Sequence, residues 1–408
     1  MNFFKQMSVR KRLGLTFAIA ILFLDMLLYS VIIPLTPYYE ENFKVSSTLI
    51  GILFSSYSIT LLLFTTYFGN LTDRIGRKKP IIIGLIGMSV STILFSHPLN
   101  FEMLILARGL QGIASAATWT AALALLADLF VKKERSIAMG FAMTSMSAGT
   151  LLGAPIGGLL IEFGGYATPF YTISVLLVIV MIFAAIYLQD VPRDEIQVPK
   201  KIMDLLRQRE VIWILTIMVI SEGTLTMLEP ILPIYLSGAF TGNSFFIGLM
   251  FGILTLAYGI MAPVSGFLVN KYTPSRVVLV GLVLVGLFLP FIIMAKSTMQ
   301  MVIALLLIGA SMGLAVSPTL TMLGNTQGDD GQNSYGALYS LFNIFFAVAA
   351  IIGPFLGGAL TDVFTLKITI FLASGAVLLC TIGLSLTRKK SMHKQECKFS
   401  PNAGQQVK

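Results

Sequence analysis

The chain has 408 residues, of which 56% are hydrophobic and only 12% are charged. A soluble domain has about 45–50% apolar and about 25% charged residues, so this composition excludes an ordinary soluble protein and predicts a polytopic membrane protein. The net charge of +9 would suit nucleic acid in a soluble protein, but the cations follow a membrane-topology pattern, and no nucleic-acid partner is expected. Two cysteines, Cys380 and Cys397, offer neither a disulfide framework nor a ligand cluster, so no metal and no cofactor are expected.

The first apolar run, from about Leu13 to Tyr38, is too long for the apolar part of a signal peptide and is expected to remain as the first span. Asp25 lies about midway along it. A carboxylate at the centre of a membrane helix costs on the order of 2.5–3.5 kcal/mol on insertion scales, which makes Asp25 the first candidate functional residue. Pro34 and Pro37 remove backbone donors, and they predict a kinked helix that lines a cavity.

Twelve apolar segments are long enough to cross a hydrocarbon core of about 30 Å. They are expected at residues 13–38, 48–70, 80–97, 100–127, 137–162, 166–188, 211–238, 243–269, 277–296, 299–325, 333–361 and 365–387. Of the 28 Lys and Arg residues, all but Lys44, Arg108, Lys296 and Lys367 fall in the terminal segments or in alternate loops. This excess on one side follows the positive-inside rule and predicts that both termini are cytoplasmic.

A charged linker divides the spans into six and six, and a repeat supports this division. Residues 153–158, GAPIGG, recur as residues 353–358, GPFLGG, at an offset of 200 residues. Two related halves with a site at their interface are typical of secondary transporters. The predicted fold is an all-α integral membrane protein with twelve transmembrane helices in two six-helix pseudo-repeat bundles. Its predicted parts are a bundle at 1–188, a cytoplasmic linker at 189–210, a second bundle at 211–388 and a disordered cytoplasmic tail at 389–408.

The loop after the second span, residues 69–80, reads GNLTDRIGRKKP. It resembles the cytoplasmic signature G-x-L-x-D-R-x-G-R-[RK] of the major facilitator superfamily and lies at the expected place. Asp73 stands at a helix end with cations close behind it, which suits a charged latch that breaks when the two halves rock. The alternative is a solvated, positively charged loop. The resemblance implies a gating role for Gly69, Asp73, Arg74, Gly76 and Arg77.

The fifth predicted span carries small residues at every fourth position, at Ser145, Gly149, Gly153 and Gly157. Such residues share one helix face and allow close contact, so plain packing is the simpler explanation. The order GTLLGAPIGG resembles the fifth-helix signature of the antiporter branch of the superfamily, with Ala154 where Pro is frequent. This resemblance favours export and implies a gating role for Gly153, Pro155 and Gly157.

Arg108 lies within the fourth predicted span, where a guanidinium needs a partner or water. Its side chain would reach the membrane surface if it extended outward, which is the structural alternative. The sequence Arg108-Gly-Leu-Gln111-Gly112 resembles the R-x-x-Q-G pattern of the superfamily. The resemblance implies a polar role for Arg108 near a proton path.

Glu222 and Glu229 in the seventh predicted span are seven residues apart and share nearly one helix face. At 1.5 Å per residue, Glu222 is expected at nearly the depth of Asp25, and Glu229 about 10 Å further along, near the depth of Arg108. Three carboxylates are thus expected to face one cavity from opposite halves. Removal from water favours the neutral form of an acid, so each can hold a proton or a cation. Structural hydrogen bonding is the alternative.

Two stretches resemble a smaller group of transporters within the superfamily. Residues 227–234, MLEPILPI, and residues 24–28, LDMLL, followed by Pro34 and Pro37, are similar to the vesicular monoamine transporters and their bacterial drug/proton antiporter relatives. The similarity covers essentially all twelve spans. It implies that Asp25 and Glu229 take part in amine recognition and proton coupling.

Phe251 and Tyr258 match an aromatic pair that lines the amine site of those transporters. Two aromatic residues at helical spacing more often pack than bind ligands, but beside carboxylates a cation–π role is expected. The remaining candidate aromatic residues are expected to fill the bundle and are not assigned to a site. These are Tyr29, Trp119, Phe342 and Phe346.

Some positions depart from the vesicular transporters. Tyr57 stands in place of a second-helix Lys, Val316 in place of a tenth-helix Asp, and Ala350 in place of a Tyr. Asn343 stands in place of an eleventh-helix Asp and is expected to belong to the substrate-binding residues. Glu222 has no acidic counterpart there. The proton number and the coupling pathway of the family therefore do not carry over.

The expected function is a proton-coupled antiporter that exports cationic or amphipathic amines and drugs by alternating access. Asp25, Glu222, Glu229 and Arg108 are expected to couple it to protons. A proton-coupled symporter for a small neutral solute is the alternative. An enzyme is not expected, because the two His residues lie outside helix centres and no G-x-x-x-x-G-K-[ST] motif is present. The expected location is a bacterial plasma membrane, where the chain would act as a monomer.

Overall fold

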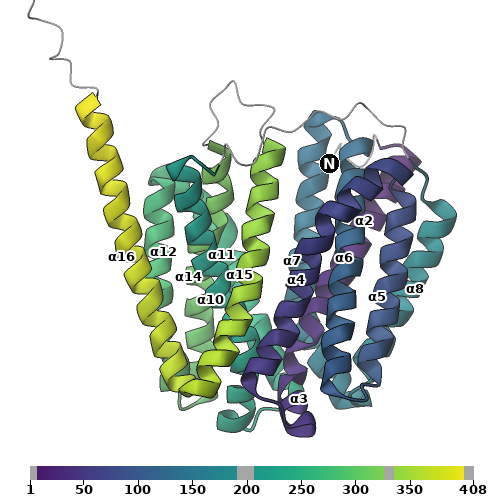
Figure 1. The fold of residues 1–408 in the computed structure, drawn as a ribbon, viewed down its shortest axis with the longest axis horizontal. Helices are drawn as coiled ribbons and strands as arrows, with labels where there is room; N and C mark the ends of the chain where they lie inside the picture. The colour runs from purple at the N-terminus through teal and green to yellow at the C-terminus, as the bar shows by residue number, and fades with distance from the viewer. Residues whose placement is uncertain (1–6, 191–205, 326–334, 399–408) are drawn as a thin grey trace, which may run out of the picture.

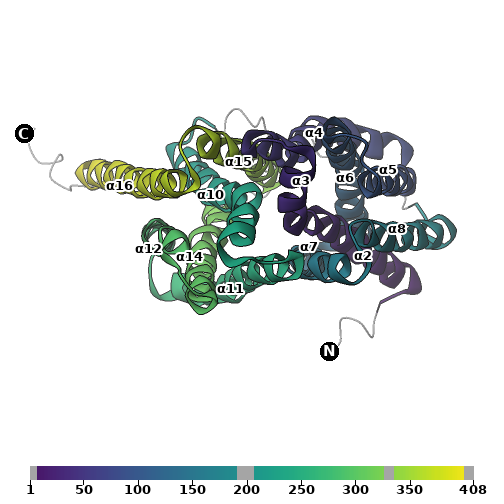
Figure 2. The same ribbon diagram turned by 90° about the horizontal axis from the view of Figure 1, so that it is seen from below.

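The structure is a computed structural model that describes residues 7–190, 206–325 and 335–398. Within these residues, twelve helices are long and apolar enough to cross a membrane. Figures 1 and 2 show them as two groups that lie side by side, one from each half of the chain. The predicted all-α membrane fold with twelve spans is confirmed.

The N-terminal half contains six spans. The first is interrupted: α2 ends at Val31, a 3-10 turn η1 covers Ile33–Leu35, and α3 follows in a new direction. Pro34 and Pro37 cannot donate backbone hydrogen bonds, so the predicted kink occurs where these prolines stand. The helices of this half are α2 (Val9–Val31), α3 (Thr36–Phe43), α4 (Ser47–Ile75), α5 (Lys78–Ser96), α6 (Phe101–Leu129), α7 (Lys132–Gly164) and α8 (Thr168–Tyr187).

The C-terminal half repeats this arrangement with one further break. The span predicted at 277–296 is divided at Pro290, which lacks the N–H needed to continue the helix. The helices of this half are α10 (Arg209–Phe240), α11 (Ser244–Lys271), α12 (Pro274–Phe288), α13 (Phe291–Met294), α14 (Thr298–Asn325), α15 (Tyr335–Val363) and α16 (Leu366–Lys398).

The tail prediction needs a correction. Disorder was expected from residue 389, but α16 continues to Lys398, and residues 399–408 lie outside the described ranges. The segment from Thr387 to Lys398 contains no Gly or Pro, and five of its twelve residues are Lys or Arg, which are good helix formers. Its cations also stand at the C-terminal end of the helix, where they complement the helix dipole.

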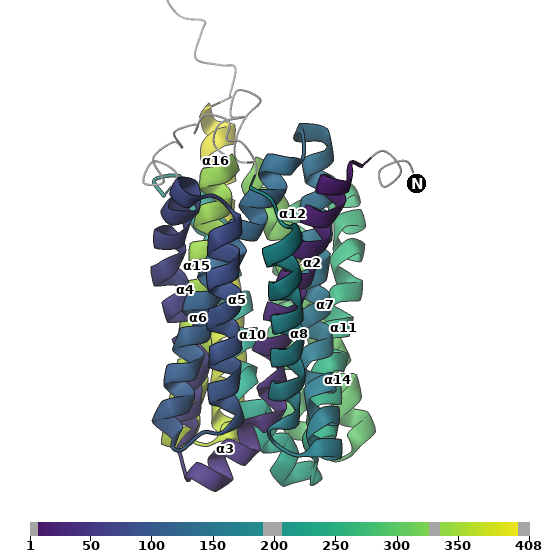
Figure 3. The ribbon, with the colours of Figure 1, turned by 90° about the vertical axis from the view of Figure 1, so that its right-hand side faces the viewer.

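The bundle has two ends. We call the end where α8 finishes and α10 begins the linker side, and the other end, which carries α3, the opposite side; Figure 3 shows both. The two halves pack together mainly through α4 against α15 and α7 against α11. The closest of these contacts lie toward the opposite side, where Gly358 meets the carbonyl of Ser47 and Gly158 meets that of Ser244.

The two glycine motifs have equivalent surroundings. Gly153 and Gly157 of α7 pack on α2 within their own half, where an added Cβ would lie 2.6 Å from the carbonyl oxygen of Leu27 and 2.4 Å from Val31. Gly353 and Gly357 of α15 pack on α10 in the same manner. Gly158 and Gly358 instead approach α11 and α4 of the other half. The repeat in the sequence is therefore also a repeat of helix contacts.

Candidate functional site

Asp25 is held inside the N-terminal half by two side chains of α6. Its carboxylate is fully buried and accepts a hydrogen bond of 2.6 Å from Ser115 Oγ and another from Trp119 Nε1. Tyr57 of α4 lies within electrostatic range of it. Each carboxylate oxygen of Asp25 thus accepts from one neutral donor, and Arg108 lies within electrostatic range of it.

Arg108 is fully buried and surrounded by aromatic rings. Its guanidinium carbon lies 4.5 Å from the ring centroid of Tyr29, 4.9 Å from that of Tyr57 and 5.5 Å from that of Phe54. The guanidinium donates to Gln111 Oε1 over 2.8 Å and to the carbonyl of Tyr29 over 3.4 Å. Cation–π contacts of this kind are worth about 2 kcal/mol or more once desolvated, so the cage stabilises the buried cation.

Three polar groups of this cage remain without a partner. Arg108 Nε, Gln111 Nε2 and the Tyr57 hydroxyl are buried and have no hydrogen-bond partner among the described residues. A buried polar group without a partner costs roughly 1–3 kcal/mol, so such groups tend to persist where they serve a ligand or a second conformation.

Tyr29 connects the two halves near the centre of the bundle. Its ring stacks on Arg108, and its hydroxyl donates a hydrogen bond of 2.8 Å to Glu229 Oε2 of α10. Arg108 also lies within electrostatic range of Glu229, as their predicted depths required. A cation of one half and a carboxylate of the other therefore share one intervening tyrosine.

The other predicted site residues of the C-terminal half lie around Glu222. Its side chain is buried and is within electrostatic range of Glu229 on the same helix and of Tyr258 on α11. Phe251 is buried and Tyr258 is half-buried. Asn343 is exposed on α15. The structure thus groups Glu222, Glu229 and Tyr258, while Asp25 lies against α6 in the other half.

Two residues that the sequence analysis assigned to packing contact the candidate acids directly. Trp119 donates to Asp25 and Tyr29 donates to Glu229. A signal for Trp119 was present, because four polar or amphipathic side chains of α6 recur at helical spacing and so share one face. They are Arg108, Gln111, Ser115 and Trp119. Tyr29 has no such signal, since its role depends on a residue of the other half.

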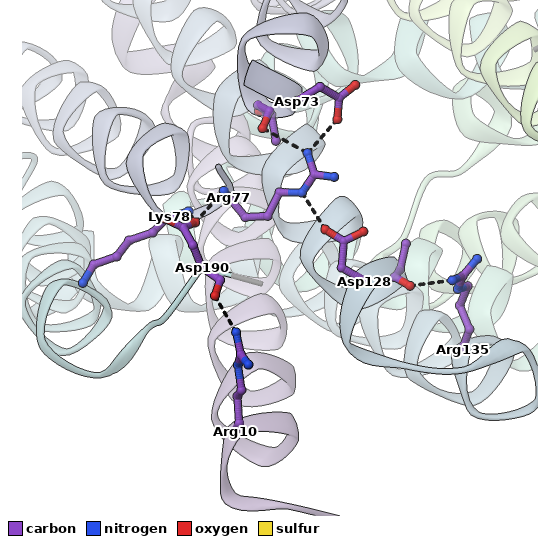
Figure 4. A network of polar contacts seen from close by, with 9 residues as sticks. Arg10, Asp73, Arg77, Lys78, Asp128, Arg135 and Asp190 are labelled. Atoms are coloured by element: carbon purple, nitrogen blue, oxygen red, sulfur yellow. Dashed lines mark hydrogen bonds and ion pairs between the residues drawn. The ribbon is translucent and has the colours of Figure 1, made fainter. Parts of the chain in front are cut away.

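The charged loop between α4 and α5 is centred on Arg77. Figure 4 shows its guanidinium between two carboxylates, with Nη1 at 2.7 Å from Asp73 Oδ1 and Nε at 2.7 Å from Asp128 Oδ2. Burial alone would lower the pKa of Arg77, but the hydrogen bonds to Asp128 and Asp73 outweigh it and raise that pKa above its usual range. All three side chains belong to the N-terminal half. In this conformation the predicted latch fastens helices within one half.

Asp190 completes this network after α8. Its Oδ1 accepts from the backbone N–H of Arg77 over 2.8 Å and of Lys78 over 2.9 Å, and its carbonyl accepts from Arg10. Gly76 lies directly beside it with φ +94°, and a Cβ there would stand 2.6 Å from Asp190 Oδ1. Gly76 is thus required by both backbone conformation and space. Arg74 is exposed, and Gly69 has open space around it.

Of the three predicted gating residues in α7, one lies between the halves. Pro155 contacts Gly248 and Gly252 of α11, with its Cγ 2.8 Å from the position of a Cβ on Gly252. Gly153 and Gly157 face α2 of their own half. The contacts of Pro155 would therefore change when the two halves move relative to each other.

These features agree with comparisons to known proteins. The sequence profile of the Major Facilitator Superfamily matches residues 18–224 and 214–399. The chain therefore belongs to the Major Facilitator Superfamily. It is a membrane transporter and not an enzyme.

Among curated proteins, the chain is similar to the synaptic vesicular amine transporter of Bos taurus, with 29% identity over 316 residues. That alignment covers 76% of this chain and 60% of the transporter, so the chain spans about 60% of that relative's length. It is also 29% identical over 372 residues to the probable vesicular acetylcholine transporter-B of Danio rerio, covering 86% of this chain and 74% of that protein.

The fold is similar to that of a solved bacterial homologue of the human lysosomal transporter Spinster, described as inward-facing and unoccupied. The TM-score is 0.85, and the match covers 95% of this chain and 98% of the other. The identity is 14%, so this likeness concerns the fold alone.

Proposed function

We propose that this transporter is a proton-coupled antiporter that exports cationic or amphipathic amines. The observation that carries the proposal is the contact of Glu229 with Tyr29 on Arg108, because it joins an ionisable acid of one half to a buried cation of the other. Intramembrane ionisable residues mark substrate and proton pathways in transporters. The similarity to vesicular amine and acetylcholine transporters supports an amine as the substrate.

The exchange follows from competition between a proton and an ammonium group for the same carboxylate. An ionised Glu229 attracts the amine, and a protonated Glu229 no longer holds it. The Tyr29 hydroxyl donates to the carboxylate and so favours its ionised form. Asp25 is served in the same way by Ser115 and Trp119. Each half therefore carries at least one acid that can exchange its proton.

The apolar body of the substrate would pack on α11. Phe251 and Tyr258 are two turns apart on this helix, and Tyr258 is near Glu222. An aromatic ring beside a carboxylate suits an organic cation, because the carboxylate balances the charge while the ring face attracts it. Glu222 would assist as a second proton acceptor, and Asn343 would offer an amide to polar groups of the substrate.

The transporter would need no cofactor, since the proton gradient supplies the free energy. The excess of Lys and Arg in the terminal segments and alternate loops supports a topology with both termini in the cytoplasm of a bacterial cell. In that topology the linker side faces the cytoplasm. We propose that a monomer is the transporting unit, because both acids and the aromatic pair come from one chain.

The test is uptake of a labelled monoamine and of a cationic dye into proteoliposomes with an imposed pH gradient. Wild type is compared with Asp25→Asn, Glu229→Gln and the matched control Glu210→Gln, which changes a carboxylate at the end of α10 outside the site. We expect gradient-driven transport to be lost in the first two variants and kept in the third. Equal transport by all four proteins would overturn the mechanism.

A proton-coupled symporter for a small neutral solute remains the second candidate, because it shares the fold. The direction of the response distinguishes the two. An antiporter accumulates solute on the acidic side of the membrane, whereas a symporter accumulates it on the alkaline side. Accumulation of a neutral solute on the alkaline side, with no amine transport, would favour the symporter.

A further inference from the structure

A carboxylate of the C-terminal half caps a helix of the N-terminal half. Asp362, one residue before the end of α15, accepts hydrogen bonds from the backbone N–H of Ser47 over 3.0 Å and of Thr48 over 2.8 Å. It also accepts one from the hydroxyl of Thr48 over 2.5 Å. Ser47 and Thr48 are the first two residues of α4. None of the charged motifs of the sequence points to this contact.

The first turn of α4 depends on this carboxylate. The first four N–H groups of any helix lack partners within the helix. In α4, Ser46 satisfies one of them, since its Oγ accepts from the N–H of Leu49, the third residue of the helix. Asp362 satisfies those of the first two residues. From Ile50 onward the N–H groups bond within the helix, beginning with the carbonyl of Ser46. A part of the cap is therefore intrinsic to the N-terminal half, and the larger part exists only while α15 lies against α4.

The contact lies where the two halves approach most closely. One turn along α4, a Cβ on Gly51 would stand 2.3 Å from the carbonyl oxygen of Pro354. A Cβ on Gly358 of α15 would likewise stand 2.1 Å from the carbonyl oxygen of Ser47. The two helix backbones thus touch on the opposite side. A negative charge at the N-terminal end of α4 is also favoured by the helix dipole.

We infer that Asp362 is a latch residue that holds the two halves together on the opposite side of the bundle. Alternating access requires the halves to separate there when the linker side closes. That movement withdraws the carboxylate and leaves two N–H groups of α4 to water. The latch therefore favours the conformation that is open toward the linker side. It does so whatever solute is carried, and thus independently of the proposed function.

The repeat supplies a matched control. Glu162 of α7 is the counterpart of Asp362 at the offset of 200 residues that relates the glycine motifs. It is exposed, and in the described part of the chain it makes no hydrogen bond to α11. The first turn of α11 is capped by its own Asn243, which accepts from Phe246 over 2.9 Å. The latch is thus specific to one of the two equivalent interfaces.

The experiment measures spin-label distances in the full-length protein in proteoliposomes, without any substrate. Cys380 and Cys397 are first replaced by Ser. One label pair, Leu99→Cys with Lys296→Cys, reports the opposite side. A second pair, Val131→Cys with Tyr272→Cys, reports the linker side. The labelled residues are exposed, and each pair has one member in each half.

We expect Asp362→Ala to lengthen the distance on the opposite side and shorten that on the linker side, with the ratio of the two conformations shifted on the order of 3- to 10-fold, as for loss of a helix cap. Asp362→Asn retains an acceptor oxygen and shifts the ratio less. Glu162→Ala leaves both distances as in wild type. Unchanged distances in a folded Asp362→Ala protein, or an equal shift in Glu162→Ala, would overturn the proposal that Asp362 holds the two halves together.

Discussion

The hydroxyl of Tyr29 donates a hydrogen bond of 2.8 Å to Glu229 across the boundary between the two halves, while its ring lies on the guanidinium of Arg108. The tyrosine thus contacts both groups and connects them, and the two charges lie within electrostatic range of each other. If the halves separate at this depth, the hydrogen bond breaks but the stacked ring remains with Arg108. The ionisation of Glu229 and the relative position of the halves are thereby linked.

Tyr29→Phe removes this donor and keeps the ring on Arg108. A hydrogen bond to a charged group is worth about 1.5–3 kcal/mol, so the ionised form of Glu229 loses support and a proton competes better with the amine. We expect amine affinity at neutral pH to fall about tenfold, with half-maximal binding displaced to higher pH. Titration calorimetry across a range of pH measures both.

The control for this prediction is Tyr38→Phe, since Tyr38 is exposed at the opposite side and stacks on Tyr166. Its binding curve is expected to match wild type at every pH. A Tyr29→Phe protein with unchanged pH dependence would show that the hydroxyl does not influence Glu229.

The two tryptophans of the chain allow Asp25 to be observed directly. Trp119 donates to Asp25, whereas Trp213 donates to the carbonyl of Leu384 over 3.0 Å in the other half. In a Trp213→Phe protein, we expect the fluorescence of Trp119 to change as Asp25 takes up a proton. The change should disappear when Asp25→Asn is added. A pH response that persists in the double variant would assign it to another group.

Arg108→Lys tests whether charge alone suffices in the aromatic cage. A Lys ammonium lacks the planar surface that stacks between Tyr29 and Tyr57 and the fork that reaches Gln111. We expect the variant to fold but to lose at least tenfold in transport rate. Arg276→Lys, at an exposed position of α12, serves as the comparison for a generic Arg-to-Lys effect. Full activity of Arg108→Lys would indicate that only the positive charge matters.

Most of the fold could be predicted because lipid imposes simple rules on a sequence. Apolar runs longer than the membrane is thick must be helices, and the prolines near Ile33 and at Pro290 account for the two interrupted spans. The glycine repeat predicted the pseudo-symmetric halves and, with them, equivalent helix contacts. The extension of α16 to Lys398 was missed because a polar segment resembles a disordered tail unless its helix propensity is summed.

The candidate site was less accessible to sequence reasoning. A charged residue inside a transmembrane span is rare because its insertion into the membrane costs free energy, so Asp25, Arg108, Glu222 and Glu229 could be identified from their positions in the sequence alone. The neutral residues that hydrogen-bond to these charges have no comparable signal in the sequence. Ser115 satisfies Asp25 through contacts between helices that are far apart in the sequence. Prediction of that kind requires the packing angle of the helices, which apolar periodicity does not encode.

Gly76→Ala and Gly69→Ala test two glycines of the loop motif separately. Gly76 is required by the folded structure, whereas Gly69 belongs to the motif without a packing requirement in this conformation. Gly76 has φ +94° and lies against Asp190, so an added methyl both strains the backbone and displaces the carboxylate that accepts from Arg77 and Lys78. Strain of this kind costs about 1–3 kcal/mol. We expect Gly76→Ala to lower the Tm measured by size-exclusion chromatography of the heated, detergent-solubilised protein.

Gly69 has no heavy atom within 4 Å of an added Cβ, so Gly69→Ala should keep the wild-type Tm. If Gly69→Ala nevertheless slows transport, its glycine is needed in a conformation where another helix approaches it. Equal Tm values for both variants would contradict the packing of Asp190 on this turn.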